Sequence, residues 1–359
     1  MKIPEKILSN NRGIALLLTI SIITVLIAGV LEWNRKVRTS VVASAAVRDR
    51  LTLSHMAASG VHAAMAMLIK DKIDSDSDSL QEDWANPEKI EEAIRQIPFE
   101  NGTVSFKITD ERSKLQINAL VLYPEGQQFN EAQRELWDRF LRLLPAPEDY
   151  QEDADPNAII NSIKDWLDSG DDDATTGLSG AESGYYQGLD PPYDPRNGPF
   201  YHLGELALVK GVTLDLLDGA GGIPGISQYI TVHGSTNTEE KIIKFEGRIN
   251  INTAELPVLT ALLPPESQEI AQAIYDYRLE TNDQVYIHDL SKPDWYQQAP
   301  GAGSIQIDPD LITTLSDIFS IDADASLNDM KLRVTAVVQR EKDKKSGRWG
   351  CKVLNWHTK

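Results

Sequence analysis

A crowded group of carboxylates lies in a glycine-containing segment near the middle of the chain, and these side chains are well suited to bind an ion. Six acidic residues fall within eighteen positions: Asp165, Asp168, Asp171, Asp172, Asp173 and Glu182. Carboxylates held this close repel one another, and a bound hard cation relieves the repulsion. Calcium is the natural candidate because it accepts six to eight oxygen ligands in irregular geometry. The segment therefore predicts a calcium site.

One alternative stays open, an acidic loop that is exposed to solvent and binds no ion. An EF-hand would place acids at alternate positions, with a central glycine and a glutamate at the twelfth, and this segment lacks that pattern. Zinc is disfavoured because the segment contains no cysteine and no histidine pair. A second acidic group, formed by Asp322, Asp324 and Asp329, is expected to be a solvated surface.

The rest of the sequence offers no set of residues suited to catalysis. The six histidines are scattered, and there is neither a Gly-x-Ser-x-Gly motif nor a glycine-rich phosphate loop. We expect no catalytic residues and no enzymatic activity. A net charge of −19 argues against nucleic acid as a partner, since phosphates attract lysine and arginine. Cys351 is the only cysteine, which excludes an intramolecular disulfide.

The elements that must carry the acidic segment begin with a membrane anchor. Residues Ile14 to Leu31 form an eighteen-residue run without a charged side chain. As a helix this run would be about 27 Å long, enough to cross a hydrocarbon core. Lys2, Lys6 and Arg12 precede it, and such a basic flank stays on the cytoplasmic side. We therefore expect the remainder of the chain to be delivered across the membrane.

Three interpretations of this anchor are open. A cleaved secretory signal needs a small-x-small site directly after the apolar run, but Ala43-Ser44-Ala45 follows only after several charges. A plain signal anchor remains the second interpretation. The third is a prepilin-type leader, residues 1–13, which a peptidase cleaves after Gly13 so that Ile14 becomes the new amino terminus.

The anchor is predicted to continue into a long helix covering residues 14–70. There is no proline between the apolar run and Pro87. A helical stripe of Val47, Leu51, Ser54, Ala58, Val61, Met65 and Leu68 recurs at steps of four and three. Small residues are frequent in this half of the helix and would let another element approach closely. A helix that lies half in the membrane and half on a globular head is the plan of a pilin.

The order of the remaining segments predicts an α+β fold with a helical insertion. Strand patterns cover residues 102–109, 114–117, 331–339 and 349–356. We expect 114–117 to pair with 102–109, and 331–339 to form a hairpin with 349–356 around a turn of Lys, Asp, Ser and Gly. We assign residues 71–117 and 319–359 to a β-rich head, and residues 226–250 to strands that return to it. Residues 118–225, with the acidic loop, and residues 251–318 are predicted to be two helical units of an inserted α domain.

The two helical units resemble each other weakly in sequence. Gln116-Ile117-Asn118-Ala119 matches Asn250-Ile251-Asn252-Thr253-Ala254, and residues 158–166 match residues 269–277. We interpret the two units as copies of one internal repeat. The first copy is longer because it contains the acidic stretch.

A series of short motifs, in order along nearly the whole chain, resembles the K-type minor pseudopilin of the type II secretion pathway, the general secretion pathway protein K family. The motifs are the leader with Gly13, DERSKLQINAL at 110–120, DWLD at 165–168, GAESGYY at 180–186, PPYDPRNGPF at 191–200 and ININTA at 249–254. The resemblance implies a type IV pilin-like fold, with a long N-terminal helix, an antiparallel sheet and an inserted α domain.

The same resemblance implies a function and a set of partners. A protein of this family is a subunit of the pseudopilus tip, which initiates or caps the pseudopilus during export of folded periplasmic proteins. It is complexed with the I-type and J-type minor pseudopilins and works with other pseudopilins and an inner-membrane assembly platform. It spans the inner membrane of a Gram-negative bacterium once, with its bulk in the periplasm.

The family also carries calcium in its head, which the resemblance extends to this chain. Asp165, Asp168, Asp171 and Glu182 are the first candidates for its ligands, with Asp173 as a further one. Cleavage after Gly13 and methylation of Ile14 are implied as well.

The fifth position after the expected cleavage site distinguishes this chain from major pilins. Those carry a glutamate there, which neutralises the amino terminus of a neighbouring subunit inside the apolar filament, whereas this chain carries Leu18. A buried unpaired charge costs several kcal/mol. A subunit that lacks the countercharge fits the tip, where no subunit stands above it.

A different class of function is suggested by residues 249–278. This segment resembles a helix-hairpin-helix of DNA-binding proteins, in which a glycine-containing hairpin meets phosphate. Here the turn is Leu263-Pro264-Pro265-Glu266-Ser267, which lacks glycine and adds an acid. A membrane-anchored periplasmic protein that binds DNA is therefore the alternative, and a protein-contact module without nucleic acid is the preferred interpretation.

Overall fold

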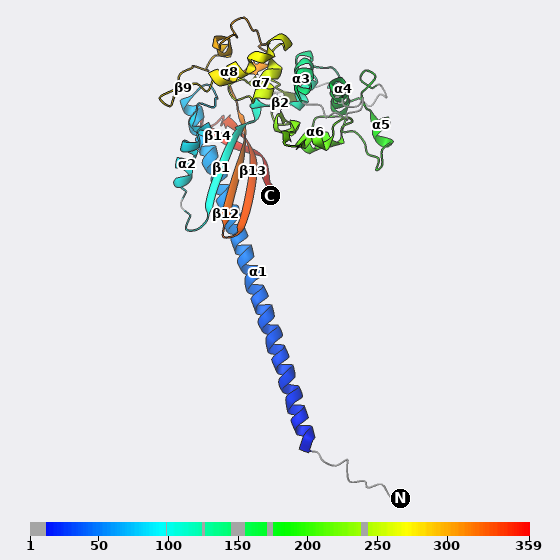
Figure 1. Ribbon diagram of the computed structural model, residues 1–359, viewed down its shortest axis with the longest axis vertical. Coiled ribbons are helices and arrows are strands. Elements are labelled where there is room, and N and C mark those ends of the chain that lie inside the picture. The colour runs from blue at the N-terminus through cyan, green and yellow to red at the C-terminus, as the bar shows by residue number, and fades with distance from the viewer. Residues whose placement is uncertain (1–11, 98, 124–125, 145–154, 171–174, 238–242) are drawn as a thin grey trace.

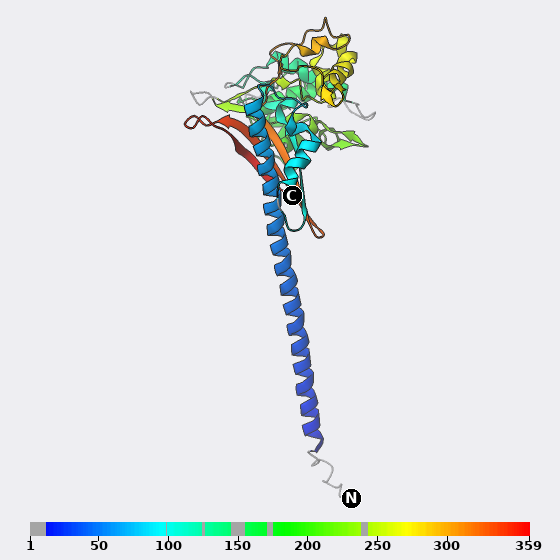
Figure 2. The ribbon, with the colours of Figure 1, turned by 90° about the vertical axis from the view of Figure 1, so that its left-hand side faces the viewer.

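The longest element of the protein is a single helix that carries the head at one end. The computed structural model describes residues 12–97, 99–123, 126–144, 155–170, 175–237 and 243–359. Helix α1 (Arg12–Asp74) has 63 residues, and its first half stands apart from everything else (Figures 1 and 2). The large apolar side chains from Ile14 to Leu31 are between 51% and 71% exposed. By length and composition the helix can cross a membrane. The predicted helix is confirmed, and it ends four residues beyond Lys70.

The second half of α1 packs against a four-stranded antiparallel sheet. The strands are β1 (Thr103–Asp110), β12 (Ile318–Leu327), β13 (Met330–Lys342) and β14 (Trp349–Thr358), in the order β1-β12-β13-β14. The helix buries Leu53, Met56, Val61 and Leu68 on this sheet. Of these four residues, Val61 and Leu68 belong to the stripe expected from the sequence. Val47 and Leu51, at the start of that stripe, are exposed.

Small residues on α1 decide which face meets the sheet. Ala57, Gly60 and Ala64 lie on the buried face, and a Cβ atom added to Gly60 would lie 2.8 Å from Val104 Cγ1 of β1. A larger side chain at this position would push the helix away from the sheet. The expectation that small residues permit a close approach is confirmed here.

Strand pairing differs from the expectation at one point. The hairpin of β13 and β14 is confirmed. Residues 114–117, expected as the partner of β1, instead contain β2 (Leu115–Gln116), which pairs in parallel with β5 (Ile230–Thr231). The partner of β1 is β12, far along the chain.

The segment between β1 and β12 forms the inserted α domain, which lies beyond the end of the sheet (Figure 1). It has its own hydrophobic core, separate from that of the sheet and α1. Its α-helices are α3 (Glu131–Leu143), α4 (Pro156–Leu167), α5 (Ser183–Gln187), α6 (Leu214–Asp218), α7 (Leu256–Leu262) and α8 (Ala271–Tyr277). Helix α2 (Pro87–Arg95) instead packs beside β1 in the head (Figure 1).

Short elements make up the rest of the secondary structure in the described residues. The 3-10 helices are η1 (Asp83–Ala85), η2 (Glu111–Ser113), η3 (Ile117–Leu120), η5 (Leu203–Leu208), η6 (Ile226–Gln228), η7 (Pro265–Ile270) and η8 (Trp295–Gln298). The remaining strands are β3 (Gly219–Ala220), β4 (Ile223–Pro224), β6 (Ser235–Asn237), β7 (Ile243–Phe245), β8 (Ile249–Asn250), β9 (Thr281–Asn282), β10 (Val285–Tyr286) and β11 (Ile312–Thr313).

Residues 226–250 do not return to the head sheet as expected. In the described part of the chain their strands pair elsewhere, β5 with β2, β6 with β7, and β8 with β11. Ile230 and Ile249 are fully buried in the core of the α domain. Because these apolar side chains are buried inside the insertion, the segment stays there.

Candidate metal centre and polar junction

Three of the five predicted calcium ligands come together at the end of helix α4. Asp165 lies in its last turn, Asp168 caps its C-terminus, and Glu182 precedes α5. One carboxylate oxygen from each lies within 4.8 Å of the other two. The exposed fractions of the three residues are 0%, 6% and 3%. Asp171 and Asp173, with Asp172, lie outside the described residues.

Backbone amides shape the loop around Asp165. The N–H groups of Thr176 and Ala181 donate to its carboxylate at 3.1 and 2.9 Å. A Cβ atom at Gly180 would lie 2.0 Å from Asp165 Oδ2, so only glycine allows the loop to pass this close. Burial raises the pKa of Asp165, and the hydrogen bonds from Thr176 partly oppose that rise.

One lysine neutralises part of the charge at this centre. Lys164 Nζ lies 2.6 Å from Asp168 Oδ2 and 4.0 Å from Asp165 Oδ1. The three carboxylates and this lysine together carry a net charge of −2, inside a largely buried site. Hard oxygen ligands with an excess of negative charge suit a divalent cation such as calcium. The residues present therefore fit the ion that the sequence predicts.

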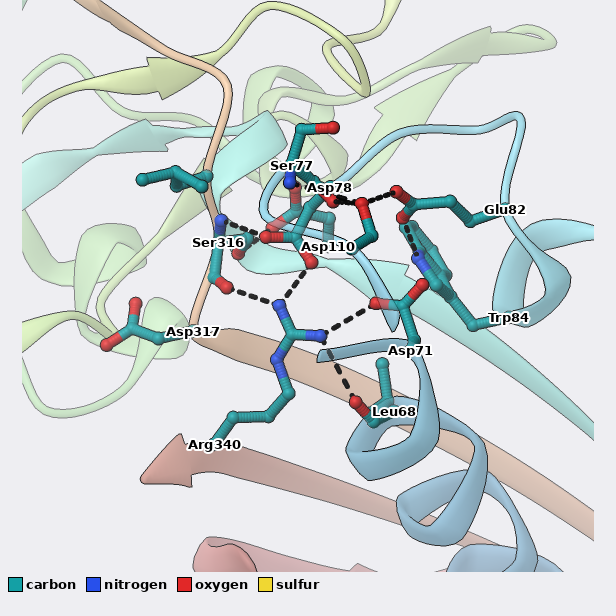
Figure 3. Close-up of polar contacts among 12 residues, drawn as sticks. Leu68, Asp71, Ser77, Asp78, Glu82, Trp84, Asp110, Ser316, Asp317 and Arg340 are labelled. Carbon is teal, nitrogen blue, oxygen red and sulfur yellow. Dashed lines mark hydrogen bonds and ion pairs between the residues drawn. The ribbon is translucent and has the colours of Figure 1, made fainter. Parts of the chain in front are cut away.

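A second group of three carboxylates, Asp71, Asp78 and Glu82, was not foreseen (Figure 3). The segment that contains them, residues 71–83, has the polar composition of a loop, but Asp78 is fully buried. Arg340, 3% exposed, points into this group from β13. Its guanidinium donates to Asp71 Oδ2 at 2.9 Å and also to Asp78 Oδ1.

The guanidinium also bonds backbone carbonyls from two other elements. It donates to Leu68 O of α1 at 3.2 Å and to Ser316 O, just before β12, at 2.6 Å. An internal cation thus occupies the centre of this acidic group. We interpret it as a structural junction rather than as a metal centre.

Asp110 extends this junction into the α domain. It accepts hydrogen bonds from Ser316 Oγ at 2.5 Å, Thr253 Oγ1 at 2.6 Å and Asn250 Nδ2 at 2.8 Å. Asn250 Nδ2 also donates to Asp78 O at 3.0 Å. One buried network therefore joins four parts of the chain. These are the end of α1, the two chain crossings between the head and the α domain, and the start of the second helical unit.

Burial shifts the acidity of this network. Burial raises the pKa of Asp71 to about 7, with Glu82 and Asp78 adding to the rise and Arg340 opposing it. Burial also raises the pKa of Asp110 to about 6, against the hydrogen bonds that its carboxylate accepts. Both carboxyl groups therefore hold a proton more strongly here than in water.

The other sites expected from the sequence lie on the surface. Asp324 forms a two-point ion pair with Arg333 at 2.7 and 2.9 Å, and Asp322 accepts a hydrogen bond from Thr335 Oγ1. Gly13, Ile14 and Leu18 lie on the free part of α1, where Ile14 is 60% and Leu18 is 58% exposed.

Comparison with known proteins gives one consistent family. The family model described as "Type II secretion system (T2SS), protein K" matches residues 113–220. The type II secretion system protein K of Aeromonas hydrophila is 29% identical over 154 residues, 42% of this chain and 44% of that protein. This match thus spans less than half of the relative's length.

Two further relatives match over longer stretches. The putative type II secretion system protein K of Escherichia coli K12 is 25% identical over 267 residues, 72% of this chain and 76% of that protein. The protein K of Klebsiella pneumoniae is 24% identical over 271 residues, 72% of each chain.

The fold also matches a solved structure, a chain of the GspK-GspI-GspJ complex from the type 2 secretion system of enterotoxigenic Escherichia coli. The TM-score is 0.61 at 16% sequence identity, covering 88% of this chain and 99% of that chain. At this identity the likeness shows a shared fold over the matched part of the chain.

Proposed function

Since the chain belongs to the type II secretion system protein K family, we propose that it is a minor pseudopilin at the tip of the type II secretion pseudopilus. There it initiates or caps assembly, so that folded periplasmic proteins are exported across the outer membrane. The observation that carries the proposal is the fold shared with the solved relative over 88% of this chain. A family of structural secretion components does not call for catalysis.

The proposed partners follow from the solved relative, which is a complex with GspI and GspJ. This chain is proposed to bind the I-type and J-type minor pseudopilins of its own bacterium, other pseudopilins and the inner-membrane assembly platform. Nucleic acid is not among the partners, because a net charge of −19 repels phosphate.

The amino terminus supports a single-pass arrangement in the inner membrane, with the head in the periplasm. Cleavage after Gly13 would expose Ile14 for methylation at the membrane end of α1. Leu18 offers no carboxylate to the amine of a subunit placed above it. An unpaired amine in an apolar filament costs several kcal/mol, so the tip is the favourable position for this chain.

The proposed calcium ion would be held by Asp165, Asp168 and Glu182, with Asp171 and Asp173 as further ligands from the same loop. Bound there, it would supply positive charge and fix the path of the loop between α4 and α5. Its role is structural, and the α domain that it stabilises is the part of the head farthest from the membrane anchor (Figure 1).

Matching contacts support the proposal that the α domain holds two copies of one unit. The backbone N–H of Asn118 donates to Gln116 Oε1, and that of Asn252 donates to Asn250 Oδ1, both at 3.1 Å. Each of these asparagines then bonds a backbone carbonyl far along the chain, of Phe200 and Leu290 respectively. In each unit a short strand just before the start pairs in parallel with a strand near the end, β2 with β5 and β8 with β11.

A deletion strain tests the function. Removing the gene from a bacterium that contains the remaining secretion system should leave secreted enzymes active in the periplasm and absent from the medium. The intact chain should restore secretion and should co-purify with the I-type and J-type subunits. Normal secretion in the deletion strain, or purification of the chain without either partner, would contradict the proposal.

The tip position has its own test. Leu18→Glu supplies the missing countercharge and is expected to lower pseudopilus initiation or to place the chain away from the tip. Leu17→Glu adds the same charge one position earlier and serves as the control. Equal initiation and tip position for the wild type and Leu18→Glu would contradict the role given to Leu18.

A further inference from the structure

The C-terminal hairpin of β13 and β14 has a charge opposite to that of the rest of the protein. Residues 341–359 carry six basic and two acidic side chains, a net charge of +4, in a chain of −19. The other 340 residues therefore carry −23. All six basic side chains are exposed: Lys342, Lys344, Lys345, Arg348, Lys352 and Lys359. Such a local excess attracts an acidic partner.

Strand β14 also forms an open edge of the sheet. It is last in the strand order, and among the described residues it pairs with β13 alone. Apolar side chains are exposed along it, with Val353 at 42%, Leu354 at 39% and Trp356 at 41%. A ten-residue edge strand without proline presents backbone donors and acceptors to another chain. The opposite edge differs, because helix α2 packs beside β1 (Figure 1).

The direction of β14 limits which chains can pair with it. β1 runs from the membrane side of the head to the α domain, and three successive antiparallel pairings make β14 run the other way, toward the anchor (Figure 1). If a neighbouring subunit has the same fold and is rooted in the same membrane, its first head strand runs away from the membrane, as β1 does here (Figure 1). That strand and β14 are antiparallel, the orientation that pairs through perpendicular hydrogen bonds.

A second copy of this chain does not fit the edge equally well. Pairing of β14 with its own copy in antiparallel orientation requires a two-fold axis that reverses one α1 helix, so the two anchors could not enter one membrane from the same side. Pairing of β14 with β1 of a copy meets α2 beside that strand. The turn of the hairpin projects from the head far from the anchor, which also separates it from lipid headgroups (Figure 2).

We propose that β14 is the docking edge for a neighbouring pilin-like subunit of the same assembly, whose acidic first head strand extends the sheet. Main-chain pairing supplies the binding, and the exposed lysines select the acidic partner. This inference rests on the proposed function, since it requires a neighbouring subunit rooted in the same membrane. Because only β14 is open, the sheet is extended on one side of this subunit.

Backbone geometry identifies the groups that the partner would bond. Arg333 and Lys359 exchange both of their main-chain hydrogen bonds, at 3.1 and 2.9 Å. Alternation along an antiparallel strand then turns the amides of Trp356 and Thr358 away from β13 and toward the open edge. These amides are free to exchange with solvent in the isolated chain and become bonded in the complex.

Hydrogen-deuterium exchange of the full chain in detergent tests this, alone and bound to the I-type and J-type subunits of its bacterium. Deuterium uptake of the peptide covering residues 349–359 should fall on complex formation. If the complex forms and uptake of this peptide is unchanged, the docking edge is wrong and the proposed function stands. If no complex forms, the proposed function fails and the inference fails with it.

A pair of charge variants provides a second measurement. Lys345→Glu combined with Lys352→Glu should weaken binding at low salt by more than about tenfold and should make it less sensitive to salt. Lys107→Glu combined with Lys292→Glu makes the same change in net charge at exposed positions outside the hairpin and should leave binding within about twofold. Equal effects of the two variants would show that net charge, not this edge, attracts the partner, and would overturn the inference. If the hairpin variant does not fold, the exchange experiment on the wild type decides alone.

Discussion

Replacing Arg340 with methionine should destabilise the folded head by about 3–5 kcal/mol, the loss expected when one partner of a buried ion pair is removed. Methionine fills similar space, so the main loss is electrostatic. Asp71 and Asp78 would remain buried without the cation that lies between them. The carbonyl oxygens of Leu68 and Ser316 would also lose their donor. Each unsatisfied group of this kind costs about 1–3 kcal/mol unless water reaches it.

Urea unfolding of the full chain in detergent measures the effect. Trp84 reports on the junction through Phe319. The ring centroids of Trp84 and Phe319 are 5.3 Å apart in an edge-on contact, and Cζ of Arg340 lies 4.6 Å from the centroid of the Phe319 ring. The fluorescence transition should move to lower urea in Arg340→Met. Adding Asp71→Asn and Asp78→Asn to this variant should recover part of the loss, since the stranded charges are then removed.

Arg333→Met is the matched control. Arg333 lies on the same strand and makes two hydrogen bonds to Asp324, but the two side chains are 56% and 46% exposed. An exposed pair of this kind contributes less than about 1 kcal/mol. The reasoning is refuted if Arg340→Met loses no more stability than Arg333→Met. The buried junction would then contribute no more to the free energy of unfolding than the surface pair does.

Two further predictions concern the metal centre and pH. Calcium chelation should lower the melting temperature of the wild type. Gly180→Ala should abolish that shift, because its Cβ would lie 2.0 Å from Asp165 Oδ2. Gly184→Ala is the control and should still show the shift, because nothing lies within 4 Å of its added Cβ. If chelation leaves the melting temperature of the wild type unchanged, a structural ion is ruled out. The pKa of Asp71 is about 7 in the folded chain against an ordinary value of 3.8, so the stability due to its bound proton is complete below about pH 4 and lost as pH rises through about 7. Asp71→Asn should therefore flatten the fall of the urea midpoint between about pH 5 and pH 8, and an unchanged slope would show that Asp71 does not titrate there.

Features set by local sequence were predictable, because periodicity and composition act over short distances. The charge-free run from Ile14 to Leu31 predicts the free half of α1, and two strand-like segments on either side of a turn rich in Lys, Asp, Ser and Gly predict the hairpin of β13 and β14. Asp165, Asp168 and Glu182 come from one helix end and the segment that follows it, so their closeness in sequence predicts their closeness in space.

Long-range pairing was not predictable from the same signals. Residues 114–117 were paired with β1 because sequence neighbours usually form hairpins, yet β1 pairs with β12 after the whole insertion. The apolar side chains of β2 and β5 are buried in the core of the α domain, which keeps both strands in the insertion. Nothing in the local pattern of either segment encodes that choice.

The polar junction did leave one signal in the sequence. On β13 the buried positions alternate through Leu332, Val334, Ala336 and Val338, and the next position in that row is Arg340. A guanidinium on the inner row of a strand requires buried acceptors. The acid-rich segment at and just after the end of α1 supplies these acceptors, Asp71 and Asp78.

The position of this junction explains why it is polar. The chain crosses from the head to the α domain after Asp110 and returns at Ser316, and both residues bond one another beside Asp78 and the end of α1. An apolar contact would stabilise these crossings without fixing their angle, whereas hydrogen bonds donated by a planar guanidinium have defined directions. We therefore expect the network to set the orientation of the α domain relative to α1. For a subunit proposed to stand at a tip, that orientation decides which surface faces outward and which edge, β14, faces the neighbouring subunit.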